Sequence, residues 1–144
     1  MWNWLISGLA SKATIVLYEG SPFFPKQDSL FKLAEEEGIT CFGTSAKFID
    51  ALRNNQIQIS NNFNLTKLKT ILSTGSPLVS ESFEYVYRNI KKDVHLASIS
   101  GGTDIVSCFV GGNPTGPVFS GEVQCECLGA VSYTHLTLPT IYSV

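Results

Sequence analysis

Short apolar runs alternate along this chain with stretches whose apolar residues recur at helical spacing. Nearly continuous apolar runs predict strands over residues 13–18, 39–42, 68–73 and 94–99. Helical spacing predicts helices over residues 28–37, from residue 45, and from residue 80 to 90, and residues 2–10 are expected to form a buried helix. Strands that alternate with helices predict an α/β fold, with an open, mostly parallel sheet flanked by helices.

The residues at the predicted boundaries suit helix ends and turns. The expected N-caps of the three helices are Asp28, Thr44 or Ser45, and Ser80, and Gly38 is expected to end the first of them. Residues 118–127 alternate apolar and polar side chains as an antiparallel strand does, which predicts the start of a β-rich subdomain near residue 118. The chain is therefore expected to divide into an α/β subdomain over residues 1–117 and the start of a β subdomain over residues 118–129.

Charged residues make up only 15% of the 144 residues, against roughly 25% in typical soluble domains. This shortage predicts that part of the surface is normally covered by another part of a longer chain. The net charge of −2 and the lack of a basic stripe argue against nucleic acid and membranes as partners. The cysteine spacing fits neither a zinc site nor a disulfide framework, so we expect reduced thiols and a cytoplasmic protein; the cysteines are Cys41, Cys108, Cys125 and Cys127.

Two turns that follow predicted strands carry the candidate chemistry. The strand that ends at Ile99 runs into Ser100-Gly101-Gly102, and a hydroxyl and a carboxylate, Thr103 and Asp104, come next. Paired glycines let a backbone approach a ligand closely, and this hydroxyl and carboxylate suit a phosphate oxygen and a hard divalent cation. Gly75-Ser76-Pro77 follows the preceding strand, and sheets of this kind bind ligands at the carboxyl ends of their strands. Ordinary turns are the alternative interpretation for both segments.

Four stretches, in this order and at these distances, resemble the adenylate-forming acyl-CoA synthetases, and within that family the branch that activates acetoacetate. They are residues 1–10, 43–49, 71–78 (Ile-Leu-Ser-Thr-Gly-Ser-Pro-Leu) and 98–105 (Ser-Ile-Ser-Gly-Gly-Thr-Asp-Ile). The resemblance extends from residue 1 to about residue 129. It implies a ligase in which ATP activates a carboxylate as an acyl-adenylate, pyrophosphate leaves, and the acyl group passes to the thiol of coenzyme A. Acetoacetate, ATP and coenzyme A are then the substrates, with Mg²⁺ expected beside the nucleotide.

The resemblance also implies roles for individual residues. Gly75-Ser76-Pro77 is expected to lie along the adenosine of ATP or AMP, and the nucleotide site is expected to include Ser98, Ile99, Ser100 and Gly102. Thr103 resembles the residue whose hydroxyl meets the α-phosphate, so Thr103 and Asp104 are the candidate catalytic residues. Asp104 stands where the family usually has Glu, a carboxylate associated with magnesium. Its shorter side chain should draw the ion closer or leave room for a water.

Gly101 stands where related acetyl-CoA synthetases have a tryptophan that closes the acyl pocket. The lack of an indole there leaves space for a longer acyl chain, which agrees with acetoacetate over acetate. The family's lysine-ended phosphate loop and its carboxy-terminal domain with a catalytic lysine have no counterpart in these residues, and adenylation depends on such charge stabilisation. We therefore expect an inactive piece of an active parent enzyme.

Residues 130–144 depart from the family and resemble a translated transposon-end sequencing adapter, so they are expected to be a non-native tail. A genuine strand, rich in Thr, Tyr, Val and Leu, is the alternative. Three other interpretations stay open for the whole chain. It could belong to a synthetase for another short or medium-chain acid, form a non-catalytic nucleotide-binding α/β module, or fold poorly and aggregate through exposed apolar faces.

Overall fold

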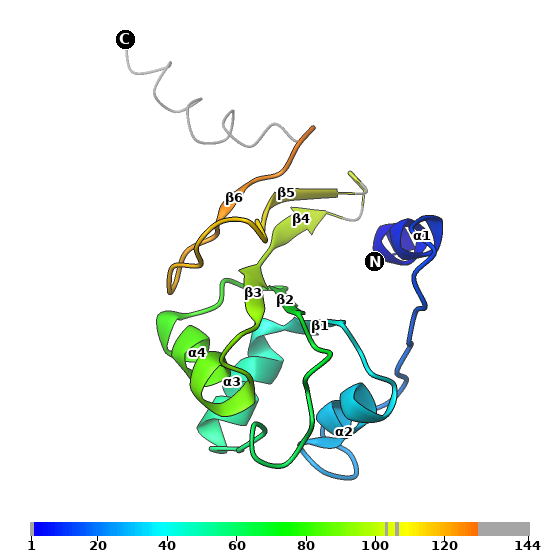
Figure 1. Cartoon of the computed structure of the whole chain (residues 1–144). Helices are drawn as coiled ribbons and strands as arrows, with labels where there is room; N and C mark the ends of the chain where they lie inside the picture. Colours follow the sequence, from blue (N-terminus) through cyan, green and yellow to red (C-terminus); the bar gives the residue numbers. More distant parts are fainter. Residues whose placement is uncertain (1, 103, 106, 130–144) are drawn as a thin grey trace.

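A computed structural model describes residues 2–102, 104–105 and 107–129, with side chains from Leu5 onward (Figure 1). Helices and strands alternate in its first two thirds. The helices are α1 (Trp2–Ala10), α2 (Ser29–Glu36), α3 (Ala46–Asn54) and α4 (Ser80–Tyr85), which continues into the π-helical turn η1 (Val86–Ile90). The strands are β1 (Cys41–Ser45), β2 (Thr70–Thr74), β3 (His95–Ser98), β4 (Ser100–Gly102), β5 (Ser107–Gly111) and β6 (Cys125–Glu126).

The six strands form two sheets of three strands each. In the first, β1, β2 and β3 lie side by side in chain order and are all parallel, as the α/β pattern predicts. In the second, β4, β5 and β6 are antiparallel. A single residue, Ile99, separates β3 from β4, so the chain passes directly from one sheet into the other (Figure 1).

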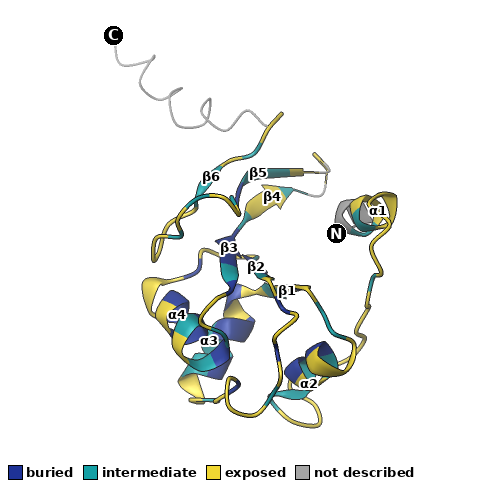
Figure 2. Ribbon diagram, viewed as in Figure 1, coloured by how far each residue is buried: buried dark blue, intermediate teal, exposed yellow. Residues whose placement is uncertain are grey.

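The core lies between the helices and one face of the parallel sheet (Figure 2). Phe42, Ile71 and Leu96 stand at the same level of β1, β2 and β3, and each is buried. Helix α3 adds Phe48, Ile49 and Leu52, whose spacing places them on one helix face. Ser45 begins this helix as predicted, because its side chain accepts a hydrogen bond from the Phe48 amide at 3.2 Å.

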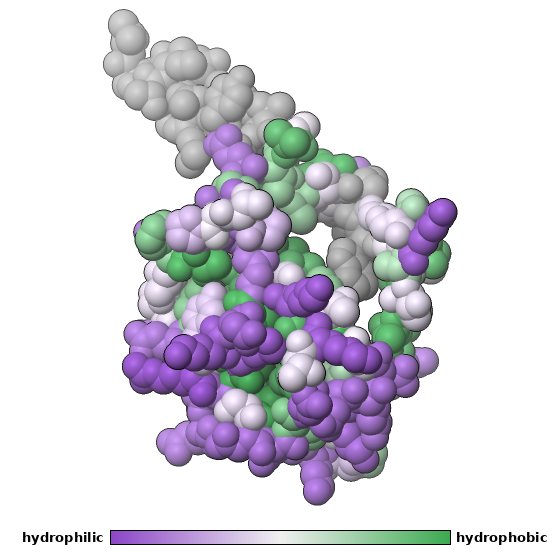
Figure 3. Space-filling view, viewed as in Figure 1, coloured by the Kyte–Doolittle hydropathy of each residue, from purple (hydrophilic) through white to green (hydrophobic). Residues whose placement is uncertain are grey.

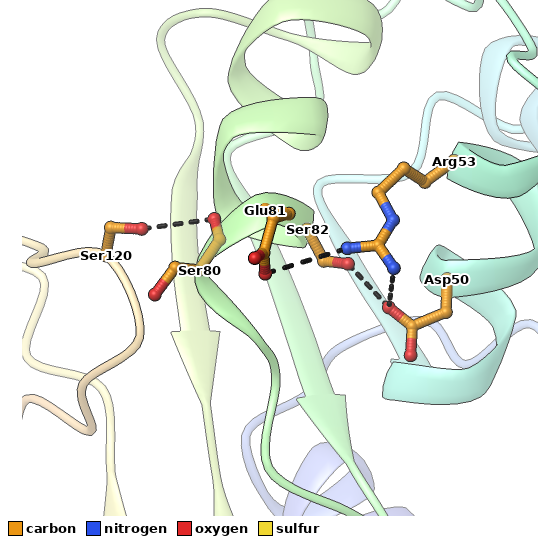
Figure 4. Close-up of polar contacts among 6 residues, drawn as sticks. All are labelled: Asp50, Arg53, Ser80, Glu81, Ser82 and Ser120. Carbon is orange, nitrogen blue, oxygen red and sulfur yellow. Dashed lines mark hydrogen bonds and ion pairs between the residues drawn. The ribbon is translucent and has the colours of Figure 1, made fainter.

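A polar contact joins α3 to α4 beside this core (Figure 4). Ser82 is completely buried, and its hydroxyl donates to Asp50 Oδ1 at 2.5 Å. The Arg53 guanidinium lies 3.9 Å from Asp50 and 3.9 Å from Glu81 on α4. The two helices are thus held together by a partly buried hydroxyl–carboxylate bond, with the ion pairs of Arg53 beside it.

Two predictions for the first eighteen residues are wrong. Residues 13–18 form no strand, and they are mostly exposed, with Leu17 73% accessible. A β-branched run becomes a strand only when a neighbouring strand takes its hydrogen bonds, and among the described residues none pairs with it. Helix α1 forms as predicted but is not buried, because Ile6 and Leu9 are 62% and 65% accessible.

Smaller differences concern caps and the later strands. Asp28 precedes α2 without a side-chain cap bond, and Ser80 is the first residue of α4, whose N-cap is Val79. Gly38 ends the α2 region with a φ of +61°, as expected. Of residues 118–127, only Cys125 and Glu126 form a strand, because a turn closes between Phe119 and Glu122. The antiparallel sheet already begins at Ser100, and the division at residue 118 stays a prediction.

The surface differs between the two halves of the view in Figure 3. Hydrophilic residues gather over α2, α3 and α4, while apolar and neutral residues are more frequent around α1 and β4–β6. In the part of the chain that the structure describes, the helices are all too short or too polar to cross a membrane. Residues 130–144, predicted to be a non-native tail, lie outside the described residues.

Candidate functional site

The parallel sheet brings the two predicted loops together at its carboxyl edge. Ser73 near the end of β2 pairs with Ser98 at the end of β3, and the Ile99 amide donates to the Ser73 carbonyl at 2.8 Å. The segments that follow, Gly75-Ser76-Pro77 and Ile99-Ser100, therefore start from neighbouring positions. This is the edge at which parallel α/β sheets bind ligands.

The turn after β2 presents open backbone. Gly75, Ser76 and Pro77 are all exposed, whereas Leu78 directly after them is buried and anchors the turn to the core. Gly75 has a φ of +88°, in the left-handed region that favours glycine. Among the described residues, no atom beyond its chain neighbours lies within 4 Å of the place where a Cβ would stand. A planar group could therefore lie against this backbone, which fits the predicted adenosine site.

The segment after β3 is more tightly held than the sequence indicates. Neither Gly101 nor Gly102 has a positive φ. Gly101 pairs with Cys108 on β5 beside a register shift, and a Cβ on Gly101 would lie 2.5 Å from the Ser107 carbonyl oxygen. Backbone atoms of β5, rather than open space, thus occupy the direction in which a side chain would point. The acyl pocket assigned to Gly101 stays a prediction.

The two candidate catalytic residues follow β4. Thr103 lies outside the described residues. Asp104 is exposed in a turn, and no group of three ligating His, Cys, Asp or Glu side chains occurs among the described residues. Mg²⁺ commonly binds through one or two carboxylates, substrate phosphates and waters, so a single carboxylate is compatible with an ion that arrives with ATP.

One polar group near this edge was not foreseen from the sequence. Ser73 is completely buried, and its hydroxyl has no hydrogen-bond partner among the described residues. Thr44 on β1 and Ser98 on β3 stand at the same level of the sheet. Three residues with hydroxyl side chains therefore form a row across the three strands, close to where the two loops begin. The sequence contains these residues in its motifs, but only the strand register places them in one row.

A second unforeseen feature is the side chain of Gln124, which organises the turn after β5. Its carbonyl oxygen accepts from the Asn113 amide at 3.0 Å and lies 2.8 Å from His95 Nε2. Its amide nitrogen donates to the carbonyls of Asn113, Gly116 and Pro117 at 3.1, 3.4 and 2.9 Å. His95 lies at the start of β3, away from the candidate loops, and this contact agrees with a structural role.

The cysteines behave as free thiols in the described structure. Burial raises the pKa of the Cys127 thiol, and the neighbouring Cys108 and Cys125 raise it further. A raised pKa keeps the thiol protonated and makes it a weaker nucleophile. The antiparallel sheet beside the candidate site therefore offers no activated cysteine at this position.

The chain resembles known proteins over most of its length. It is 57% identical, over 129 residues, to the acetoacetyl-coenzyme A synthetase of Rhizobium meliloti (strain 1021), a match of 90% of this chain and 20% of the relative. A malonamoyl-CoA synthetase of Penicillium aethiopicum, vrtB, is 44% identical over 90% of the chain. No protein-family model matches. The chain thus spans about a fifth of the length of the curated relatives that it matches.

The fold agrees with these sequence matches. An acetoacetyl-CoA synthetase from Streptomyces lividans superposes with a TM-score of 0.81 and 43% sequence identity. The match covers 89% of this chain and 20% of that structure. The similarity in fold thus extends over most of this chain and over only a fifth of that synthetase structure.

Proposed function

We propose that this chain is a segment of an adenylate-forming acid–CoA ligase and supplies part of the site that binds the nucleotide and the acyl group. The observation that carries the proposal is the pair of loops at the carboxyl edge of the sheet, in a chain 57% identical to an acetoacetyl-CoA synthetase over 129 residues. The ligase activity belongs to the complete protein that carries this segment, and the segment alone is inactive.

The proposed reaction has two steps. A carboxylate oxygen of the acid attacks the α-phosphorus of ATP, forming the acyl-adenylate and releasing pyrophosphate. The sulfur of coenzyme A then attacks the acyl carbon, and AMP leaves. Gly75-Ser76-Pro77 lies along the adenosine, Ser98, Ile99, Ser100 and Gly102 line the nucleotide, and the Thr103 hydroxyl meets the α-phosphate. Asp104 would hold a magnesium ion that accompanies ATP, which would neutralise phosphate charge, and Gly101 would border the acyl group.

Acetoacetate is the proposed acid, and malonamate is the second candidate because a malonamoyl-CoA synthetase is among the relatives. The two acids share a carbonyl at the third carbon and differ by a methyl against an amino group of similar size. A pocket that accepts one by shape must reject the other by hydrogen bonding. The product of the first, acetoacetyl-CoA, is proposed to form in the cytoplasm and to enter lipid and ketone-body metabolism.

The test is to purify the complete protein and measure the release of AMP and pyrophosphate with coenzyme A and each acid in turn. We expect the highest kcat/KM with acetoacetate, and lower values with malonamate, acetate and butyrate. A preference for malonamate would shift the acid to the second candidate. Lack of thioester formation with every acid, together with saturable AMP binding by residues 1–129 alone, would favour a non-catalytic nucleotide-binding module.

Gly75→Ala tests the site itself in the complete protein. A methyl group on open backbone with φ of +88° should cost about 1 kcal/mol of stability and lower the affinity for ATP at least several-fold. The control is Gly38→Ala, which introduces similar backbone strain at φ of +61° beside α2, away from the loops, and also displaces the flexible Lys67 side chain. Equal losses of ATP affinity in the two variants would contradict the proposed nucleotide site.

A further inference from the structure

Ser73 and Ser82 are two fully buried serines with different surroundings. Both Ser73 and Ser82 are completely inaccessible to solvent. The Ser82 hydroxyl donates to Asp50 Oδ1 at 2.5 Å, whereas the Ser73 hydroxyl has no partner among the described residues. A buried hydroxyl without a partner destabilises the fold that contains it, because it loses its hydrogen bonds to water. Alanine would fit the same place without this cost.

The position of Ser73 connects it to both candidate loops. It lies at the level of Thr44 and Ser98 in the row across the sheet, and two residues before Gly75. Its own carbonyl accepts from the Ile99 amide, so its backbone already joins the two strands from which the loops emerge. The Gly75 turn above it has open space on its outer side.

We propose that Ser73 is a positioning residue for the nucleotide site, whose hydroxyl gains its hydrogen-bond partner from the backbone of residues 74–77 when that turn closes on a bound nucleotide. The inference rests on the proposed function. The hydroxyl has no partner among the described residues, and the closed turn supplies one. Nucleotide binding thereby forms one additional hydrogen bond within the protein. The Ser73 hydroxyl thus increases the affinity for the nucleotide without touching it.

The experiment compares Ser73→Ala with unmodified complete protein, using AMP as the probe. Thermal unfolding without nucleotide and calorimetric titration with AMP are measured on both. We expect the variant to unfold at the same temperature or higher when free, and to bind AMP about 5-fold more weakly. Ser73→Cys, which is slightly larger and donates only weakly, should show the same weaker AMP binding and serves if the alanine variant folds poorly.

Ser82→Ala is the matched control, because it removes an equally buried hydroxyl that already has a partner. It should lower the unfolding temperature with and without AMP and leave the AMP affinity unchanged. If Ser73→Ala behaves in this way, or keeps its full AMP affinity, the proposal for Ser73 is overturned while the proposed function stands. Failure of the unmodified protein to bind AMP overturns the proposed function, and the inference about Ser73 with it.

Discussion

The side chain of Gln124 joins β3 to the turn after β5 through hydrogen bonds at both of its ends. Its oxygen accepts while its nitrogen donates to three backbone carbonyls. The backbone of this turn also lies close against β3, because a Cβ on Gly112 would lie 2.5 Å from the Ala97 Cβ. An amide is the side chain that supplies an acceptor and two donors at one position.

Gln124→Glu tests this requirement with almost no change in shape. A carboxylate cannot donate to the carbonyls of Asn113, Gly116 and Pro117, and it repels them. We expect a loss of about 1–3 kcal/mol in the free energy of unfolding, measured by urea denaturation near neutral pH. Gln58→Glu makes the same change on the exposed loop after α3 and should have little effect. Equal effects of the two changes would contradict the structural role of Gln124.

Tyr85 provides a pH-dependent measure of the core. Its hydroxyl donates to the Ile57 carbonyl at 2.6 Å, and burial raises its pKa from 10.0 to about 12. The unfolded chain therefore loses this proton at lower pH than the folded chain does. The contribution of Tyr85 to stability is complete below pH 10 and declines as the pH rises from 10 toward 12.

Tyr85→Phe should remove that decline. Below pH 10 the variant should be less stable by about 1 kcal/mol, because the Ile57 carbonyl loses its donor. Between pH 10 and 12 the difference between the two proteins should shrink. Unfolding curves in denaturant at several pH values measure this difference, with Tyr18→Phe, an exposed tyrosine, as the control. A constant difference across this range would contradict the role of Tyr85.

At the scale of elements, the contact between α3 and α4 rests on the Ser82–Asp50 hydrogen bond more than on the ion pairs around it. The Arg53 distances of 3.9 Å and the 74% accessible Glu81 side chain indicate weak, solvent-screened attraction. The Ser82 bond is short and charge-assisted and its donor is fully buried, which makes it the stronger interaction (Figure 4).

A double-mutant cycle separates these interactions. Ser82→Ala should cost about 1.5–3 kcal/mol of unfolding free energy, and Asp50→Asn should cost part of the same amount. The sum of the single effects should exceed the effect of the double variant, because both changes break one bond. Glu81→Gln, which weakens only the exposed pair with Arg53, should cost less than about 0.5 kcal/mol. Additive effects of Ser82→Ala and Asp50→Asn would show that the bond contributes nothing.

Helices and strands that are stabilised by interactions close in sequence, or by the next strand along the chain, could be predicted from the sequence. Ser45 and the 48–49–52 spacing give α3 at its observed place, and the three strands of the parallel sheet occur where apolar runs end in turns. Residues 13–18 have a similar composition but pair with no strand in the described part of the chain, so composition alone overestimates the sheet. The position of both loops at the carboxyl edge could be predicted from the order of strands and helices along the chain. The burial of the Ser73 hydroxyl could not, because it depends on the register between strands, which no local sequence pattern contains.

At the scale of the whole molecule, exposed apolar residues gather in the first third of the chain. Ile6, Leu9, Leu17 and Phe24 are all more than half accessible. This agrees with the low share of charged residues and with a surface that other parts of a longer protein cover. Isolated from such a covering, the segment should bind to itself.

Leu17→Ser combined with Phe24→Ser should reduce this self-association, because the two side chains are 73% and 72% accessible and pack little within the chain. Sedimentation velocity of the isolated segment at increasing concentration measures the effect, which we expect as a shift from oligomers toward monomer. Leu128→Ser removes another exposed leucine, far along the chain near β6, and should change the distribution less. An equal or larger effect of Leu128→Ser would contradict a dominant role of the N-terminal residues.

The order of strands in the parallel sheet also has a consequence for biosynthesis. Because β1, β2 and β3 neighbour one another in the order in which they are translated, each new strand pairs with one already made, across a connection that contains its own helix. A nascent chain that has emerged from the ribosome as far as residue 104 holds all three parallel strands, helices α2, α3 and α4, and both loops. This part of the protein can therefore fold while later segments are still being synthesised.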